Sequence, residues 1–137
     1  FEEEIDFWNW AKDFNGSSIF RNLKTYENSI EALLEVSMAG HEVIIISSKP
    51  WWAISDTLIW LGENKIPSKE IHFLEDKWTI DCDVYIDDAP HQLENFVKHV
   101  PNKLILRFVR PYNRPVTGTK DINNWLEFNS LLESYNL

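Results

Sequence analysis

Apolar residues along this chain follow two patterns in turn, a helical spacing of three or four residues and short continuous runs. The helical spacing predicts helices over residues 3–14, 28–39, 51–61, 91–99 and 121–135. The continuous runs predict strands over residues 42–47, 71–74, 84–86 and 103–108. Continuous apolarity is typical of strands buried on both faces of a parallel sheet. Helices and strands that alternate in this way predict an α/β fold with right-handed crossovers.

Small residues mark the expected ends of three helices. Asn28 or Ser29 can cap the second helix through a side-chain oxygen, and Gly40 follows its last turn. Gly16 and Gly62 follow the first and third helices. Because glycine adopts the left-handed backbone that closes a helix, we expect these helices to end there.

The composition excludes several classes of protein. The chain has 137 residues, 44% of them hydrophobic and 26% charged, which indicates one globular domain and excludes a wholly disordered chain. Cys82 is the only cysteine, so no intrachain disulfide can form and we expect a reducing, cytoplasmic location. The longest aliphatic run, Val43 to Ile46, is far short of the roughly 20 residues of a membrane helix. We therefore expect no membrane partner.

Charge narrows the choice of partners further. Lys and Arg number 13 against 22 Asp and Glu, which gives a net charge of -9. Each contact to a nucleic-acid phosphate needs a cation, so a duplex-DNA binder is not expected. The net charge does not exclude a protein that binds a nucleotide-sized ligand together with a metal ion. The acidic start, FEEEID, is unlike a signal peptide.

Candidate chemistry stands where the predicted strands end, because ligands of parallel α/β sheets bind beyond the carboxyl ends of the strands. The strand over residues 42–47 ends in Ser47-Ser48. A hydroxyl there, with free backbone N–H groups at the next helix, can bind a phosphate. Ordinary helix capping is the alternative interpretation.

A pair of carboxylates follows another predicted strand. Asp87 and Asp88 come directly after Val84 to Ile86. Adjacent carboxylates repel each other unless a cation lies between them, and oxygen ligands of this kind suit Mg²⁺. A solvated turn is the alternative. Lys77 follows the strand over residues 71–74, and a surface lysine is its alternative interpretation.

The order of these groups is more informative than any one of them. Serine, then lysine, then an aspartate pair, each at or after a strand end, is typical of phosphoryl transfer with one member missing. A response-regulator receiver uses similar groups, but its acid pair comes first in the chain. That order excludes a receiver here.

The segments IIISSKP, EDK and VYIDDAP resemble the second, third and fourth motifs of the haloacid-dehalogenase (HAD) superfamily of phosphatases. The segments IFRNLKTYENSIEAL, IDD and RPYNR (residues 110–114) are similar to the 5'(3')-deoxyribonucleotidase family. This likeness runs from about Phe20 to Trp125. It implies a HAD-like, Rossmann-like parallel sheet with flanking helices, a small helical cap and Mg²⁺ as cofactor.

The resemblance also implies roles for the residues at the strand ends. Ser47 would hydrogen-bond a phosphoryl oxygen, with Ser48 assisting. Lys77 would balance the charge of a phosphoaspartyl intermediate. Asp87 and Asp88 would hold Mg²⁺ directly or through water.

A helical cap is implied for the N-terminal part of the chain. Residues 1–24 would be its remnant and residues 25–137 the core, within a single domain overall. Aromatic rings of the cap, from Trp8, Trp10 and Phe20, could stack on a nucleobase. Packing of the cap itself is the alternative.

The first motif of the superfamily has no counterpart here. It is an apolar strand ending in DxD, whose first Asp is the nucleophile and whose second is the general acid/base. Asp6 lies in a helical pattern, and Asp81-Cys82-Asp83 precedes a strand instead of ending one. The family pattern would place the motif before Phe1, so we expect the first central strand to be missing from this chain.

In the superfamily that strand lies between the one ending in Ser47 and the one ending in Asp87. Its omission would leave unpaired backbone groups, and each costs about 1–3 kcal/mol when buried. We expect a missing N-terminal segment or another chain to complete the sheet. Direct pairing of Val43 to Ile46 with Val84 to Ile86 is the alternative.

Two classes of function are consistent with these residues. The first is a Mg²⁺-dependent phosphomonoesterase of the 5'-nucleotidase type, which in its complete form acts on (deoxy)nucleoside monophosphates through a phosphoaspartate. The chain as given would be inactive alone. The second is a non-catalytic nucleotide-binding or assembly domain that has lost the nucleophile motif. A phosphatase for polynucleotide ends is disfavoured by the charge of -9.

Overall fold

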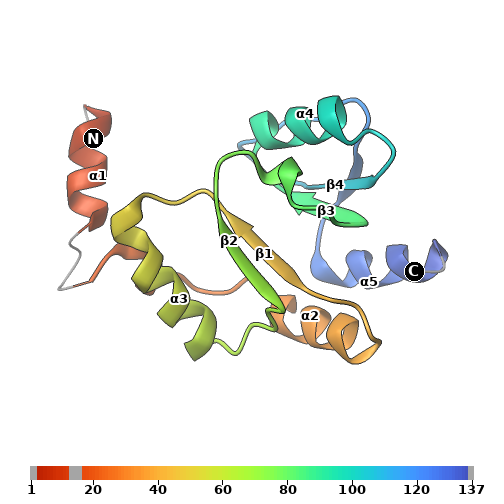
Figure 1. The fold of residues 1–137 in the computed structure, drawn as a ribbon, viewed down its shortest axis with the longest axis horizontal. Helices are drawn as coiled ribbons and strands as arrows, with labels where there is room; N and C mark the ends of the chain where they lie inside the picture. Colours follow the sequence, from red (N-terminus) through yellow and green to blue (C-terminus); the bar gives the residue numbers. More distant parts are fainter. Residues whose placement is uncertain (1–2, 13–16, 136–137) are drawn as a thin grey trace. The chain divides into compact units, whose positions relative to one another are not determined.

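The computed structural model describes residues 3–12 and 17–135 and has the α/β fold that the pattern predicts (Figure 1). Its α-helices are α1 (Glu4–Lys12), α2 (Ser29–Met38), α3 (Ile54–Glu63), α4 (Pro90–His99) and α5 (Trp125–Ser134). Its strands are β1 (Ile44–Ser47), β2 (Glu70–Phe73), β3 (Val84–Asp87), β4 (Leu104–Phe108) and β5 (Lys120–Ile122). Short 3-10 turns are η1 (Ile19–Arg21), η2 (Trp51–Ala53) and η3 (Lys77–Thr79). None of the described helices is long and apolar enough to cross a membrane.

The strands pair in parallel, as predicted, within two sheets. β1 pairs with β2, and β3, β4 and β5 form the second sheet in that order. The chain divides into two compact units, a first unit of residues 1–73 and a second unit of residues 74–137, with one sheet in each. Among the described residues β1 has β2 as its strand neighbour and β3 has β4. The expected alternative in which β1 pairs directly with β3 would join the two units, and it stays a prediction.

The expected end of the third helix at Gly62 is also wrong. Residues 51–53 form a 3-10 turn, and α3 then continues through Gly62 to Glu63. The left-handed residue that follows is Lys65, with a φ of 54°. Gly40, by contrast, takes a φ of 96° directly after α2, as predicted. The expected end at Asn15-Gly16 lies outside the described residues.

The prediction of helix from residue 121 missed β5. Lys120–Ile122 extends the second sheet, and its register places Asp121 opposite Arg107 and Ile122 opposite Phe108. The helix begins later because the side chain of Asn124 accepts a hydrogen bond from the Glu127 N–H, which caps its first turn. The hydrophobic pattern does not predict this strand because its short KDI sequence has no apolar run.

In the first unit, the stretch around η1 is tied to α3. The Ser18 N–H donates to Asp56 at 2.7 Å, and Arg21 pairs with Glu63 at 2.6 Å. The Trp60 indole N–H donates to the Leu23 carbonyl at 2.7 Å. These contacts hold η1 and the residues on either side of it against α3.

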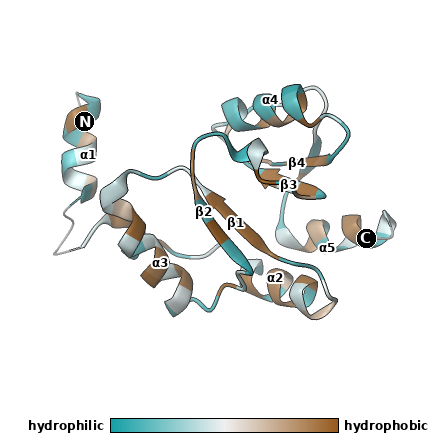
Figure 2. Ribbon diagram, in the orientation of Figure 1, coloured by the Kyte–Doolittle hydropathy of each residue, from teal (hydrophilic) through white to brown (hydrophobic). Residues whose placement is uncertain are grey.

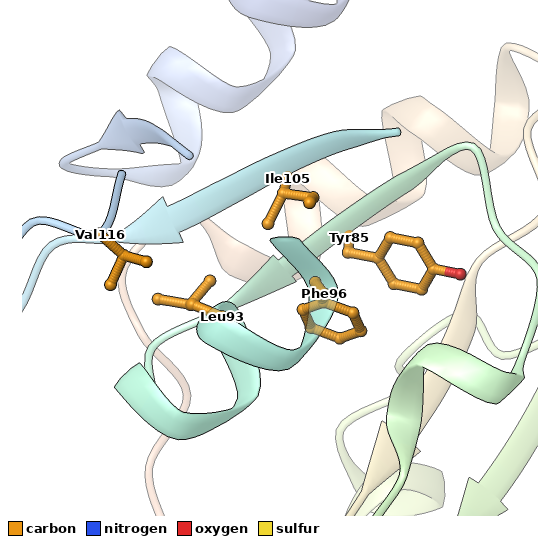
Figure 3. Close-up of a cluster of buried hydrophobic side chains, with 5 residues drawn as sticks. All are labelled: Tyr85, Leu93, Phe96, Ile105 and Val116. Carbon is orange, nitrogen blue, oxygen red and sulfur yellow. The ribbon is translucent and has the colours of Figure 1, made fainter. Parts of the chain in front are cut away.

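The second unit has its core between α4 and the β3–β4 pair. Its buried cluster consists of Tyr85, Leu93, Phe96, Ile105 and Val116 (Figure 3). The rings of Tyr85 and Phe96 stack with centroids 4.4 Å apart. β1, β3 and β4 are largely hydrophobic, whereas α4 is hydrophilic along much of its length (Figure 2). This pattern fits buried strands and a helix that buries one face.

Gly118 occupies a position that other residues fit poorly. Its φ is +94°, and a Cβ there would lie 2.9 Å from the Val97 side chain. We expect Gly118→Ala to lower the free energy of unfolding by about 1–3 kcal/mol, because it adds both backbone strain and a clash. Gly62→Ala is the matched control, since Gly62 is helical and its Cβ would meet nothing within 4 Å. The control should raise stability by up to about 1 kcal/mol in urea unfolding. Equal effects of the two variants would contradict the argument.

Candidate functional site

The acid pair shapes the turn between β3 and α4. Asp87 is the last residue of β3, and its Oδ1 accepts the backbone N–H groups of Asp88 at 2.8 Å and Ala89 at 3.0 Å. Pro90 then begins α4, at a helix position where a missing N–H costs nothing. The Asp87 carboxylate thus fixes the backbone that carries Asp88.

Lys77 makes an ion pair with this turn. Its Nζ lies 2.8 Å from Asp87 Oδ2, and the side chains of Lys77 and Asp87 are only 14% and 8% exposed. The expected proximity of lysine and acid pair is therefore present within the second unit. A surface lysine is not what the structure shows.

The loop that carries Lys77 is held from α4. The Glu75 carbonyl accepts the Lys77 N–H at 2.9 Å and the Gln92 side-chain amide at 2.9 Å. Gln92 is 1% exposed, so its side chain is a buried support for this loop. Sequence reasoning missed Gln92, because a lone glutamine on a predicted helix resembles a solvated residue.

The loop after β4 reaches the acid pair from another direction. The Tyr112 hydroxyl donates a hydrogen bond to Asp88 Oδ2, and the Asn113 side-chain amide donates to the Asp88 carbonyl at 2.9 Å. The guanidinium of Arg110 lies 4.1 Å from the centroid of the Phe108 ring. Tyr112 and Asn113 belong to the RPYNR segment, which carried the resemblance without an assigned role.

A buried charge lies beside this loop. Arg107 donates through Nε and Nη2 to both oxygens of Asp121, each at 2.7 Å, and its side chain is 5% exposed. The guanidinium holds the pKa of Asp121 below its usual range, mainly by these hydrogen bonds, and the pKa of Arg107 is raised in return. The available signal was a single arginine within the apolar run KLILRF.

The candidate phosphate-binding serines lie in the first unit. Ser47 ends β1 and is half-buried, and Ser48 is exposed just beyond the strand. Both therefore stand at the carboxyl end of a parallel strand, where the sequence predicted them. Their convergence with Lys77 stays a prediction.

The candidate cap aromatics also lie in the first unit. Trp8 on α1 and Phe20 in η1 both contact Trp52, with ring centroids 6.1 and 6.0 Å apart. The Lys49 ammonium lies 4.9 Å from the centroid of the Phe20 ring. Trp10 instead contacts Phe7, at 6.0 Å. Trp52, which sequence reasoning did not select, thus joins two of the three candidate rings.

The carboxylate oxygens of the acid pair are of the ligand type that Mg²⁺ prefers. Mg²⁺ takes oxygen ligands and commonly binds through one or two carboxylates, with water and substrate phosphate completing its shell. Asp87 accepts two N–H groups and the Lys77 ammonium, so Asp88 is the better placed to donate to a metal. In the described part of the chain, no group of three or more His, Cys, Asp or Glu side chains forms a metal site. A metal ion bound by Asp87 and Asp88 would therefore need further ligands, and the role of the two acids as ligands stays a prediction.

Removing one partner of the largely buried pair of Lys77 and Asp87 should be costly. We expect Lys77→Met to lower the free energy of unfolding by about 3 kcal/mol, because it leaves the buried Asp87 carboxylate without its cation. Arg114→Met is the control, since the Arg114–Glu94 pair is 63% and 51% exposed. The control should change stability by less than about 1 kcal/mol in urea unfolding. A loss for Lys77→Met no greater than the control's would contradict the assignment.

Comparison with known proteins identifies the chain's relatives. Residues 4–135 match the family described as 5' nucleotidase, deoxy (Pyrimidine), cytosolic type C. A protein of Oceanobacillus iheyensis whose name describes it as a putative nucleotidase is 28% identical over 118 residues. The match covers 80% of this chain and 62% of that relative, so the chain spans less than two-thirds of the relative's length. With nearly all of its described residues inside the family match, and with a parallel α/β fold, the chain belongs to the cytosolic type C 5' nucleotidase family, which is HAD-like.

Proposed function

We propose that the complete protein is a Mg²⁺-dependent phosphomonoesterase that acts on (deoxy)nucleoside monophosphates. The observation that supports this most directly is the buried contact of Lys77 with Asp87, beside Asp88, at the carboxyl end of a parallel strand. A cation and two carboxylates at such an edge can bind and neutralise a transferred phosphoryl group. The family membership supplies the nucleotide as the substrate class.

The chain's own residues would act mainly by holding charge. Ser47 would donate its hydroxyl to a phosphoryl oxygen, with Ser48 assisting. Lys77 would share its ammonium between Asp87 and the phosphoryl oxygens, which lowers the cost of the negative charge that collects there. Mg²⁺, held by Asp87 and Asp88, would supply further charge compensation when bound.

The nucleophile of this reaction would come from outside the present sequence. In the proposed step a carboxylate oxygen bonds to phosphorus while the bond to the nucleoside oxygen breaks, and the nucleoside leaves as an alcohol after taking up a proton. Water then hydrolyses the phosphoaspartate to free the carboxylate and inorganic phosphate. In this chain Asp6 lies on α1, and Asp81 and Asp83 precede β3, so none of them matches the DxD strand end.

The proposed division of the chain follows the family pattern. Residues 1–24 would be the remnant of a helical cap, and residues 25–137 the core. Trp8 and Phe20, which belong to this segment, both pack against Trp52 of the proposed core. Their flat faces are chemically suited to a nucleobase. The family description includes the word cytosolic, and a cytoplasmic location is part of the proposal.

A second candidate function is a non-catalytic nucleotide-binding or assembly domain. The observation that favours it is the lack of a DxD strand in the 137 residues. Any sequence before Phe1 in the natural protein would distinguish the two candidates, because a DxD strand there would support the enzyme.

In the complete protein, we expect hydrolysis of a deoxynucleoside monophosphate to require Mg²⁺. Asp88→Asn should weaken Mg²⁺ binding at least about tenfold, because it removes one charge and one anionic ligand from a site with few of them. Released phosphate and Mg²⁺ titration measure the two effects. Asp81→Asn, which alters a carboxylate that is 90% exposed and lies outside the acid pair, is the control. Full turnover in excess chelator would falsify the metal requirement.

Residues 1–137 alone should release no phosphate from a deoxynucleoside monophosphate in the presence of Mg²⁺. The reason is that Ser47, Lys77, Asp87 and Asp88 include no correctly placed nucleophile. Adding a preceding segment that ends in DxD, or another chain that fills the same slot, should restore turnover if the sheet is completed in this way. Turnover by the purified chain alone that Asp87→Ala abolishes would show that the nucleophile lies within this sequence.

A further inference from the structure

We propose that Asn113 is a positioning residue, which fixes the backbone of Asp88 and is itself held in place by the buried ion pair of Arg107 with Asp121. The consequence for phosphate chemistry rests on the proposed function. The positioning role itself concerns only contacts within the second unit. The sequence alone did not make Asn113, Arg107 or Asp121 a candidate.

Asn113 uses the full hydrogen-bonding capacity of its side chain. Its Nδ2 donates to the carbonyls of Asp88 and Phe108, each at 2.9 Å. Its Oδ1 accepts from Arg107 Nη1 at 2.7 Å and from the Arg110 N–H at 3.1 Å. A side-chain amide has two N–H donors and one oxygen with two lone pairs, so every site is occupied. These four hydrogen bonds fix the orientation of the side chain, and they restrain the groups to which it is bonded.

Arg107 explains why the asparagine is held so firmly. Its planar guanidinium donates through Nε and Nη2 to Asp121 and through Nη1 to Asn113. The ion pair to Asp121 neutralises a charge that is 5% exposed, and the third contact leaves the group little freedom to rotate. A lysine could match the charge but not this fork.

The contacts form a continuous chain across the second sheet. Asp121 lies on β5, Arg107 lies opposite it on β4, and Asn113 links β4 to the residue after β3. Arg107 in turn lies opposite Asp87 in the register of β3 and β4. The network therefore connects the three strands at the edge where the acid pair stands.

Asp88 is consequently held from both sides. Its N–H donates to Asp87 Oδ1 at 2.8 Å, and its carbonyl accepts from Asn113 at 2.9 Å. The Tyr112 hydroxyl, from the residue before Asn113, donates to its carboxylate. With both adjoining peptide groups fixed, the carboxylate has a set direction before any ligand arrives. Preorganisation of this kind is what groups behind a metal ligand supply.

Hydrogen exchange at individual amides tests this role without needing a metal. In Asn113→Ala, the amides of Asp88 and Ala89 should exchange at least about tenfold faster, because the backbone they belong to loses its anchor. Asn64→Ala is the matched control, since Asn64 also donates to a carbonyl at 2.9 Å, but in the first unit. The control should leave exchange at Asp88 and Ala89 within about twofold of the unaltered chain.

Arg107→Lys tests the link between the ion pair and the asparagine. It should accelerate exchange at the same two amides by a smaller factor than Asn113→Ala. Combining the two substitutions should add less than about twofold to the effect of Asn113→Ala, because both act through one contact. Independent, multiplying effects would overturn the proposed chain of contacts.

A purely structural role for Asn113 predicts a different result. Exchange would then rise evenly over the second unit, or the melting temperature would fall with the amides of Asp88 and Ala89 unchanged, and either result would overturn the proposal. Mg²⁺ titration of the same variants separates this outcome from failure of the proposed function. If the unaltered protein binds no Mg²⁺, the metal-dependent function fails, while the exchange data still decide the role of Asn113. If it binds, Asn113→Ala should weaken Mg²⁺ binding about 10- to 100-fold.

Discussion

The candidate site depends on a constraint that burial places on charge. The side chains of Lys77 and Asp87 are only 14% and 8% exposed, so removal of either partner would leave a largely buried charge uncompensated. Their contact requires η3 and the end of β3 to meet, and Gln92 supports the loop between them through the Glu75 carbonyl. The ion pair therefore fixes the lysine relative to the acid pair. Contacts within the second unit are enough to hold these charges together.

Much of the fold could be predicted because burial leaves a clear pattern in the sequence. β1, β3 and β4 carry continuous apolar runs, and α2 and α4 carry helical spacing within one or two residues of the observed ends. β5 could not be recognised, since it lies at the edge of a sheet and buries only Ile122 among its three residues. The predicted helix end at Gly62 was wrong because tertiary packing can hold a glycine within a helix.

The sequence predicted only those residues of the candidate site that directly follow a recognisable strand. Asp87 and Asp88 follow a recognisable strand, and Lys77 follows another, so strand ends alone brought them into consideration. Arg107, Asn113 and Asp121 act through contacts that join distant positions in the chain, and no local pattern encodes such partners. An arginine in an apolar run is the exception, because a buried guanidinium requires an acid somewhere. Arg107 therefore carries a signal in the sequence, although no prediction was drawn from it.

The two compact units divide the proposed chemistry unequally. The first unit carries Ser47, Ser48 and the aromatic contacts around Trp52, which are neutral groups suited to hydrogen bonding and stacking. The second carries Lys77 and both acids, together with residues that support them: Gln92, Arg107, Tyr112, Asn113 and Asp121. Charged groups need closer support than neutral donors, because the desolvation of an unpaired ion costs far more than that of a neutral polar group. The strongly charged part of the site can therefore be preorganised within one small sheet, whatever supplies the nucleophile.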